Sequence, residues 1–236
     1  MPTLLDAPPV WGSPTPMRLF VTGGTGVLGR ALRPMAEQAG HAMCAPAHAE
    51  VDLYDPDAVV AAMAGAGAVI HLATRIRPLD QLHTPDVWRD NDRLRADASR
   101  VLVDAALQVG AAVYVQPTVT FVYPPDRPVD EDTPVDPPPI LRSALIAEEQ
   151  AGRFARAGRR GVVLRLGLLD GPGTGNDHPN PQLGATLHVH DAARALLAAL
   201  TLPSGIYNVC RNGERVSNRR FRTATAATAK PWRPDQ

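Results

Sequence analysis

The residues of this chain that are best placed for chemistry are three glycines in the segment VTGGTGVLG. Gly23, Gly26 and Gly29 follow the spacing G-x-x-G-x-x-G between an apolar run and a helical pattern. Such a turn points backbone N–H groups and the positive end of a helix dipole at a diphosphate, and a Cβ at Gly23 or Gly26 would obstruct that approach. Because strand, turn and helix agree, the sequence predicts a dinucleotide site at Gly23, Thr25, Gly26, Val27, Leu28 and Gly29.

The ribose end of this dinucleotide is marked less clearly. The tip after the second apolar run falls near Ala47 and His48, where neither an acid for a ribose 2′-OH nor an arginine for a 2′-phosphate stands. Asp52 is a candidate acceptor for the adenine amino group, with Leu53 covering the ring. Alternatively, Asp52 is a turn residue before the helix at PDAVV. We therefore expect NAD or NADP, with His48, Asp52 and Leu53 as further candidate cofactor residues.

Several arginines are candidates for binding an anionic substrate. Arg75 and Arg77 follow the run VIHLAT, at the end of a strand where doubly wound sheets place their ligands. A solvated loop is the alternative for this pair. Arg142 and Ser143 lie on a helix face that adjoins the predicted pocket, although Arg142 has Glu148 and Glu149 as alternative ion-pair partners.

The elements that must position these groups alternate along the chain. Apolar strand-like runs are separated by helical patterns, and the long helix in the middle places Leu94, Ala98, Val101, Leu102 and Ala105 on one face. Strands that are apolar along their whole length indicate a parallel sheet covered on both faces. The fold class is therefore α/β, a doubly wound parallel sheet of Rossmann type, with strands expected at 18–22, 41–46, 67–74, 111–116 and 161–167.

The composition of the sequence changes after residue 170, where glycine, proline and polar residues that interrupt helices and strands dominate. We expect three regions: a flexible N-terminal arm at 1–16, a dinucleotide-binding domain at 17–168, and a small, shortened substrate cap at 169–236. Part of the cap returns to the main sheet through the strand-like run GIYNVC. Because the cap is short, the pocket is either open or completed by a second subunit, so a homodimer is a candidate assembly.

Composition limits the classes of partner. Of 236 residues, 24 are Lys or Arg and 24 are Asp or Glu, so no net charge attracts the chain to nucleic acid or to an anionic membrane. No secretory signal and no apolar run of membrane-spanning length is present, and the two cysteines are typical of reduced thiols. We expect a soluble cytoplasmic protein acting on a small molecule.

These motifs together resemble a known family, the extended short-chain dehydrogenase/reductase superfamily in its NAD-dependent epimerase/dehydratase branch. The resemblance covers residues 18–209 and rests on the order of TGGTGVLG, DLYDPDAV, VIHLAT, RVLVDAA, LRLGLLDGPG, HVHDAAR and GIYNV. It implies that VIHLAT is the fourth strand and that Leu72, Ala73 and Thr74 line the adenosine and ribose side of the cofactor. The loop 167–172 would pass near the nicotinamide.

The resemblance also gives a reading of His188, His190 and Asp191, which look superficially like metal ligands. H-x-H-D opening a helix matches the family's V-H-V-D-D segment, where the acid caps the helix. We therefore predict no metal site. His71 lies in an apolar strand and is expected to be a core histidine with its hydrogen bonds satisfied.

The family's chemistry uses a Ser or Thr, a Tyr and a Lys, and this chain departs from that set. Alignment of the strand around YVQPTVTFVY puts Thr118 at the hydroxyl position, with Thr120 as the nearest substitute. Alignment of RSALIAEE with the family pattern Y-x-R-S-K-L-x-x-E puts Ile140 and Ala144 in place of the Tyr and Lys. A reduction without a positioned acid loses roughly 10² to 10⁴ in rate.

Tyr123 is the candidate substitute for the missing acid, because it follows the strand that carries Thr118; a packing role is its alternative. Three functions stay open. The first is NAD(P)-dependent redox or epimerase chemistry on a small substrate, either neutral or anionic, with Thr118 and Tyr123 as catalytic residues. The second is a non-redox isomerase, cyclase or lyase on the same scaffold, and the third is a cofactor-sensing protein without catalysis.

Overall fold

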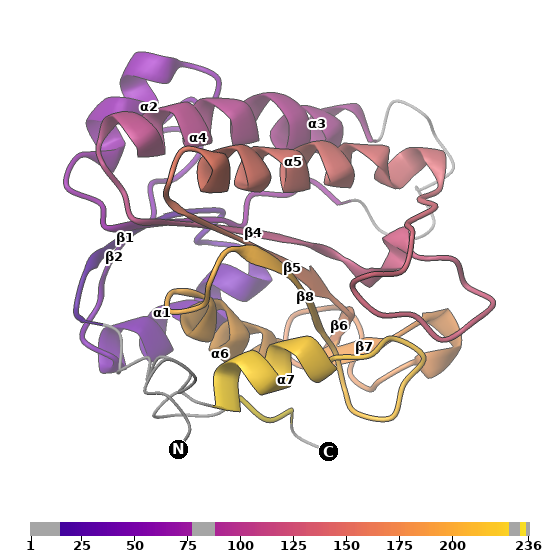
Figure 1. Cartoon of the computed structure of the whole chain (residues 1–236). Coiled ribbons are helices and arrows are strands. Elements are labelled where there is room, and N and C mark those ends of the chain that lie inside the picture. Colours follow the sequence, from indigo (N-terminus) through magenta and orange to yellow (C-terminus); the bar gives the residue numbers. More distant parts are fainter. Residues whose placement is uncertain (1–14, 77–87, 227–231, 235–236) are drawn as a thin grey trace, which may run out of the picture.

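A six-stranded parallel sheet forms the centre of the molecule (Figure 1). The computed structural model describes residues 15–76, 88–226 and 232–234. Within them the strand order is β2-β1-β3-β4-β5-β8, and every neighbouring pair is parallel. The strands are β1 (Arg18–Thr22), β2 (Ala42–Cys44), β3 (Ala68–His71), β4 (Val113–Val119), β5 (Arg160–Leu166) and β8 (Gly205–Val209).

Helices cover both faces of this sheet, as Figure 1 shows. One face carries α1 (Val27–Gln38), α6 (Val189–Ala199) and α7 (Arg219–Ala226); the other carries α2 (Pro56–Met63), α3 (Arg89–Arg93), α4 (Ser99–Gln108) and α5 (Arg142–Arg156). Each face has its own cluster of buried aliphatic side chains. The predicted doubly wound α/β fold is confirmed.

One strand has a different ordinal number from the one implied by the family resemblance. VIHLAT forms β3, the third strand of this chain and not a fourth. The reason is that the connection from β2 to β3 contains α2 and turns but no further strand. The position of β3 beside β1, which matters for the site, is as expected.

The long helix predicted through residues 94–105 is interrupted by a π-helical turn, η3 (Leu94–Ala98), between α3 and α4. A π turn holds more residues than an α turn and so rotates the side chains that precede it relative to those that follow. Within this π turn Arg95 is buried, whereas Leu94, which was placed on the apolar face, is only partly covered. The predicted face is correct for Ala98, Val101, Leu102 and Ala105.

The proline-rich segment before α5 is not part of that α-helix. Pro139–Leu141 forms a 3₁₀ turn, η5, and the α-helix begins only at Arg142. Prolines lack the N–H that an α-helix needs and disfavour the helical conformation of the residue before them. Ile140 therefore lies in the 3₁₀ turn and Ala144 in the first turn of α5.

The C-terminal part of the chain adds a small second sheet and then rejoins the first. β6 (Leu168–Asp170) pairs in parallel with β7 (Thr186–His188), and the connection between them contains the short turn η6 (Pro181–Leu183). α6 then packs on α1, and β8 extends the main sheet beside β5. Residues 1–14 of the predicted N-terminal arm lie outside the described residues. Among the described helices, none is long and apolar enough to cross a membrane.

Candidate cofactor and substrate site

The glycine turn lies where the strand order reverses direction. From β1 the chain moves to β2 on one side, and β3 then returns to the other side of β1. In doubly wound sheets, ligands bind at the carboxyl ends of the strands at such a switch point. The turn after β1 and the first turn of α1 form one wall of this position, closed by the Gly26 N–H donating to the Gly23 carbonyl at 3.0 Å.

The glycines of the turn are required by close approach of the backbone. Gly23 has φ +70°, and a Cβ there would lie 2.7 Å from the Ala73 nitrogen. A Cβ on Gly29 would lie 2.5 Å from the Gly24 Cα. Gly24, which the triplet pattern did not mark, is equally restricted because its Cβ would lie 2.4 Å from the Ala45 Cβ. The turn is therefore held tightly between β2, β3 and α1.

The N-terminus of α1 is open to a ligand. Gly26 is its N-cap and has no side chain to bond the first N–H groups, and no acidic residue lies in the first turn. Thr25 and Gly26 are exposed, and Val27 and Leu28 are half-buried. Backbone donors at a helix N-terminus favour phosphate oxygens, so the residues present here fit the diphosphate of a dinucleotide.

The residues predicted to line the adenosine side lie against this turn. The Leu72 N–H donates to the Thr22 carbonyl at 3.1 Å, and the Ala73 N–H donates to the Thr22 hydroxyl at 3.2 Å. Leu72 is buried, Ala73 is half-buried and Thr74 is exposed. The structure therefore brings the segment Leu72, Ala73 and Thr74 against the turn at Gly23.

The buried His71 side chain links the end of β1 to η3 through two hydrogen bonds. Its Nε2 lies 3.0 Å from the Leu94 carbonyl oxygen, which can only accept, so Nε2 carries the proton. Nδ1 then accepts from the Thr22 hydroxyl at 2.7 Å. Burial lowers the pKa of His71 to about 4, which keeps the ring neutral. The prediction of a satisfied core histidine is confirmed.

The residues predicted near the ribose lie on exposed turns after β2. The Asp52 Oδ1 accepts from the Tyr54 N–H at 2.9 Å, whereas the N-cap of α2 is Asp55, whose Oδ1 accepts from the Asp57 N–H at 3.0 Å. Asp52 is therefore a turn residue but not the helix cap. His48 is exposed and Leu53 is half-buried. Cofactor contacts by His48, Asp52 and Leu53 stay predictions.

A buried ion pair lies behind Thr118. The Arg165 guanidinium binds both carboxylate oxygens of Glu148, from Nε at 2.9 Å and from NH2 at 2.6 Å. Thr118 donates its hydroxyl proton to the same carboxylate at 2.7 Å. Burial lowers the pKa of Arg165, but the hydrogen bonds and charge of Glu148 outweigh burial and raise it overall. This buried network therefore joins α5 to β4 and β5, near the carboxyl ends of the two strands.

Tyr123 belongs to the same network. Its hydroxyl accepts from Arg165 NH1 at 2.7 Å and donates to the Asn208 Oδ1 at 2.9 Å. The side chain is 3% exposed, and burial raises the pKa of its hydroxyl against the opposing effect of Arg165. For Tyr123 to give a proton to a substrate, the bond to Asn208 would have to break. The catalytic roles of Thr118 and Tyr123 stay predictions.

The sequence reading missed Glu148, Arg165 and Asn208. The signal for one of them was available, because Arg165 interrupts the apolar run GVVLRLG and a buried arginine requires a partner. The predicted alternative that Arg142 pairs with Glu148 or Glu149 is wrong: Glu148 pairs with Arg165, and Glu149 pairs with Arg156.

Two of the arginines predicted to bind substrate, Arg75 and Arg142, lie at the same edge of the sheet. Arg142 is exposed at the start of α5. Arg75 is also exposed, with its Nε 3.4 Å from Asp90. Arg77 lies outside the described residues. Contact of these three side chains with a substrate stays a prediction.

Comparison with known proteins decides the family. The sequence profile described as "NAD dependent epimerase/dehydratase family" matches residues 19–186. The chain belongs to this family. NAD or NADP is bound across the family and in solved structures of this fold. The fold is shared with RMD from Pseudomonas aeruginosa in complex with NADPH, at a TM-score of 0.71 and 21% identity over 94% of this chain and 93% of that one.

Two relatives in this family are reductases by name. A 3-diazoavenalumate denitrifying reductase from Streptomyces sp is 34% identical over 220 residues, covering 78% of this chain and 72% of the relative. A dTDP-4-dehydrorhamnose reductase from Streptomyces griseus is 28% identical over 226 residues, covering 85% of this chain and 73% of the relative.

The two positions aligned with the family's Tyr and Lys lie at the start of α5. Ile140 is 39% exposed, and Ala144 is buried in a third apolar cluster with Val122 and Tyr123. Neither side chain can move a proton. That these two residues replace the family's catalytic pair stays a prediction.

The H-x-H-D segment opens α6. The N-cap is His188, whose Nδ1 accepts from the His190 N–H at 3.3 Å, so the implied cap by the acid is wrong. Asp191 lies in the first turn, buried and paired with Arg194. In the described part of the chain, no group of three or more His, Cys, Asp or Glu residues is arranged to hold a metal ion.

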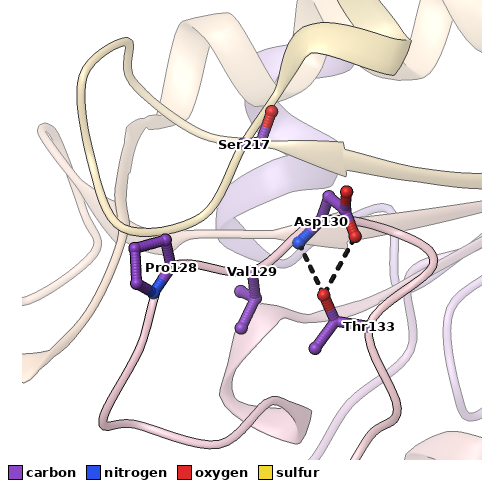
Figure 2. A pocket seen from close by; sticks show the side chains of 5 residues that line it. All are labelled: Pro128, Val129, Asp130, Thr133 and Ser217. Atoms are coloured by element: carbon purple, nitrogen blue, oxygen red, sulfur yellow. Dashed lines mark hydrogen bonds between the residues drawn. The ribbon is translucent and has the colours of Figure 1, made fainter.

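A small pocket is lined by other residues. Figure 2 shows it between the segment after β4 and the segment after β8, where Val129 and Val216 form an isolated bridge. Its volume is about 240 Å³, and Asp130 and Thr133 bond to one another on its wall. That volume is below the range of about 300–1,000 Å³ typical of ligand sites. Because it includes none of the predicted site residues, we do not assign the cofactor to it.

Proposed function

We propose that this protein is an NAD(P)H-dependent reductase whose substrate accepts a hydride without needing a proton from the enzyme, with an arenediazonium cation as the substrate class. The first support is family membership together with the open N-terminus of α1, which fits the cofactor's diphosphate. When bound, NAD(P)H supplies the hydride. Gly23, Thr25, Gly26, Val27, Leu28 and Gly29 would hold its diphosphate, with Leu72, Ala73 and Thr74 along the adenosine side.

The observation that carries the proposal is the apolar character of Ile140 and Ala144, the two residues that the family resemblance aligns with its Tyr and Lys. A ketone that accepts hydride becomes an alkoxide, which must be protonated. At the start of α5, Ile140 and Ala144 have no proton to give. The hydroxyl protons of Thr118 and Tyr123 are committed to Glu148 and Asn208. A substrate that generates no oxyanion fits this arrangement better than a ketone does.

An arenediazonium cation meets that requirement. The ring carbon that bears the diazonium group accepts the hydride with its electron pair; the C–N bond breaks, its electron pair goes to nitrogen, and N₂ leaves. The sum is Ar–N₂⁺ plus hydride giving Ar–H plus N₂, with the cofactor oxidised. Support comes from the relative at 34% identity, whose name describes a reductase that removes nitrogen from a diazo compound.

The network beneath the site then has a positioning role in the proposal. Thr118 and Tyr123, held by Glu148 and Arg165, keep the ends of β4 and β5 in place beside the hydride donor. Arg75, Arg77 and Arg142 remain the candidates at the rim for an anionic group on the substrate.

The test determines whether the hydrogen that replaces nitrogen on the ring comes from the cofactor. The protein is incubated with NADPH or NADH deuterated at the transferable nicotinamide position and with 3-carboxybenzenediazonium, and the benzoate formed is analysed by mass spectrometry. We expect deuterium at the ring position that carried nitrogen, stereospecific use of one face of the cofactor, and a rate well above that without protein. Benzoate that carries hydrogen from solvent, or no rate above background, would contradict the proposal.

A second substrate separates this function from ordinary carbonyl reduction. dTDP-4-dehydrorhamnose, the substrate class in the name of the other relative, requires a proton after hydride transfer. We expect its reduction to be slower than that of the diazonium by about 10² or more. Turnover of any substrate without oxidation of NAD(P)H would instead support a non-redox isomerase, cyclase or lyase.

A further inference from the structure

In the described part of the chain, three buried polar side chains at the contact between α3–η3 and α5 each have a polar atom without a hydrogen-bond partner. They are Asn91, Arg95 and Ser143, with exposures of 0%, 6% and 6%. The Asn91 Nδ2, Arg95 NH1 and Ser143 Oγ atoms are enclosed and make no hydrogen bond. Burying such groups unpaired costs about 1–3 kcal/mol each, and more for a charge. A ligand that accepted hydrogen bonds from these groups would remove this cost.

The three side chains come from elements that meet at the carboxyl edge of the sheet. The Asn91 Oδ1 accepts from the Arg75 N–H at 3.0 Å, which places Asn91 beside the loop that follows β3. The charge of Arg95 acts on His71 at the end of β3. Ser143 lies in the first turn of α5, and α5 contacts both α3 and η3. Asn91 and Arg95 are four residues apart on one helical run and therefore share a face.

Arg95 lies within the π turn η3 and is buried there, whereas its neighbour Leu94 is only partly covered. π turns inside α-helices are frequently found at functional sites. The turn and the buried guanidinium are thus two observations of the same unusual arrangement.

The chemistry of these groups defines the ligand. A guanidinium and an amide NH₂ can only donate, and a hydroxyl can donate as well as accept. Burial is the first cause that lowers the pKa of Arg95, and Asp92 does not compensate for it. An anionic oxygen pair would balance the charge and accept from all three donors, and arginine binds carboxylates in this bidentate manner.

The position excludes the cofactor's diphosphate as the first choice of anion. The diphosphate is expected at the N-terminus of α1, on the opposite face of the sheet from α3, η3 and α5 (Figure 1). An anion at Arg95 must therefore belong to the second reactant. We propose that Asn91, Arg95 and Ser143 form a subsite for the carboxylate of the substrate, so that the reductase acts on aryl or alkenyl carboxylates.

This inference rests on the proposed function only in taking the second reactant to be a small organic substrate. It is tested by binding alone, so that failure of hydride transfer and failure of the subsite are separate results. Cinnamate and the uncharged cinnamamide are titrated calorimetrically into protein saturated with NADPH. We expect cinnamate to bind at least about 10-fold more tightly than the amide.

The matched variants are Arg95→Gln, Arg95→Lys and Arg100→Gln, the last an exposed arginine further along the same helical run. Loss of a charged hydrogen bond should weaken cinnamate binding by about 10- to 100-fold in Arg95→Gln, with cinnamamide unchanged. Arg95→Lys should recover part of the affinity, and Arg100→Gln should match the wild type. NADPH affinity should not change in any of them.

A second readout distinguishes a ligand site from a structural arginine. Replacing an unpaired buried cation by an apolar side chain is often stabilising, so Arg95→Met should raise the Tm of the free protein by roughly 2–4 °C while abolishing the preference for cinnamate. Four results would overturn the subsite: no cinnamate binding, equal binding of the two probes, a loss of NADPH affinity in Arg95→Gln, or a lower Tm in Arg95→Met.

Discussion

The start of α1 and the start of α5 face the same edge of the sheet but are built in different ways. At α1 the site consists of main chain: glycines at close approach and N–H groups without a side-chain cap. At α5 it consists of side chains from several elements, with Glu148, Arg165, Thr118 and Tyr123 in one network and Arg95 beside it from η3. A main-chain site depends on a local sequence motif, whereas a side-chain site can be rebuilt one residue at a time.

That difference suggests how the function of this chain was altered. The dinucleotide end follows its family, because any Cβ at Gly23 or Gly29 would collide with backbone. At the proton-transfer end, the resemblance aligns Ile140 and Ala144 with the family's Tyr and Lys; Glu148 and Arg165 pair with each other there, whereas Arg95 NH1 has no hydrogen-bond partner. Hydride transfer can be retained while proton transfer is lost, provided that the substrate creates no oxyanion.

The largest expected effect is at the buried ion pair. Glu148→Gln leaves the Arg165 guanidinium buried without a carboxylate, which should lower the free energy of unfolding by about 3–5 kcal/mol. Its matched control is Glu149→Gln on the same helix, whose exposed pair with Arg156 should be worth under about 1 kcal/mol. Urea denaturation of both variants measures the difference. Equal, small effects would mean that the network does not hold α5 to β4 and β5.

The next effect is a pH dependence at the dinucleotide edge. Because the pKa of His71 is about 4 in the folded protein and about 6.5 in the unfolded chain, the unfolded chain takes up a proton first as the pH falls. This stability is fully present above pH 6.5 and is lost between pH 6.5 and about 4, by roughly 3 kcal/mol. His71→Asn should flatten that part of the stability profile. A His71 ring that titrates near 6.5 by NMR would contradict the assignment.

Gly23 and Gly110 have similar φ angles but different surroundings. Substituting each by alanine therefore separates the effect of close backbone neighbours from the effect of backbone strain. Gly23 has φ +70° and would place a Cβ 2.7 Å from backbone atoms, whereas Gly110 has φ +77° and nothing within 4 Å. Gly110→Ala should cost about 1 kcal/mol from backbone strain. Gly23→Ala should cost about 2 kcal/mol more, because backbone has to move. Thermal unfolding of the pair is sufficient, and equal losses would show that the turn is not tightly packed.

The smallest effect concerns Tyr123. Tyr123→Phe removes one hydroxyl from between Arg165 and Asn208 and should cost about 1–2 kcal/mol of stability. Under the proposed function, kcat with a diazonium substrate should change by less than about 10-fold. A fall of about 10² or more at unchanged stability would instead support Tyr123 as the catalytic acid.

The sequence was sufficient for features that depend on local pattern. Apolar runs predicted the strands of the main sheet, and the glycine spacing predicted the turn at the switch point, because both are set by residues adjacent in the chain; the small sheet of β6 and β7 was not predicted. Arg95 was not predicted, since the prediction took only apolar residues as buried, and Arg95 is a charged residue in a π turn. Glu148 and Arg165 are 17 residues apart and on different elements, so their pairing depends on the packing of α5 against β5.

The most direct test of the central claim, that the main chain at the start of α1 binds a dinucleotide, compares Gly26→Asp with Gly26→Asn. Gly26 is the N-cap and has an ordinary φ of −70°, and both residues are favoured caps, so both variants should fold with similar stability. Only the aspartate places a negative charge at the expected diphosphate. We predict that NADPH and NADH, titrated by fluorescence, bind Gly26→Asp at least about 10-fold more weakly than Gly26→Asn. Equal affinities of the two variants, or no binding of either nucleotide to the wild type, would contradict the account.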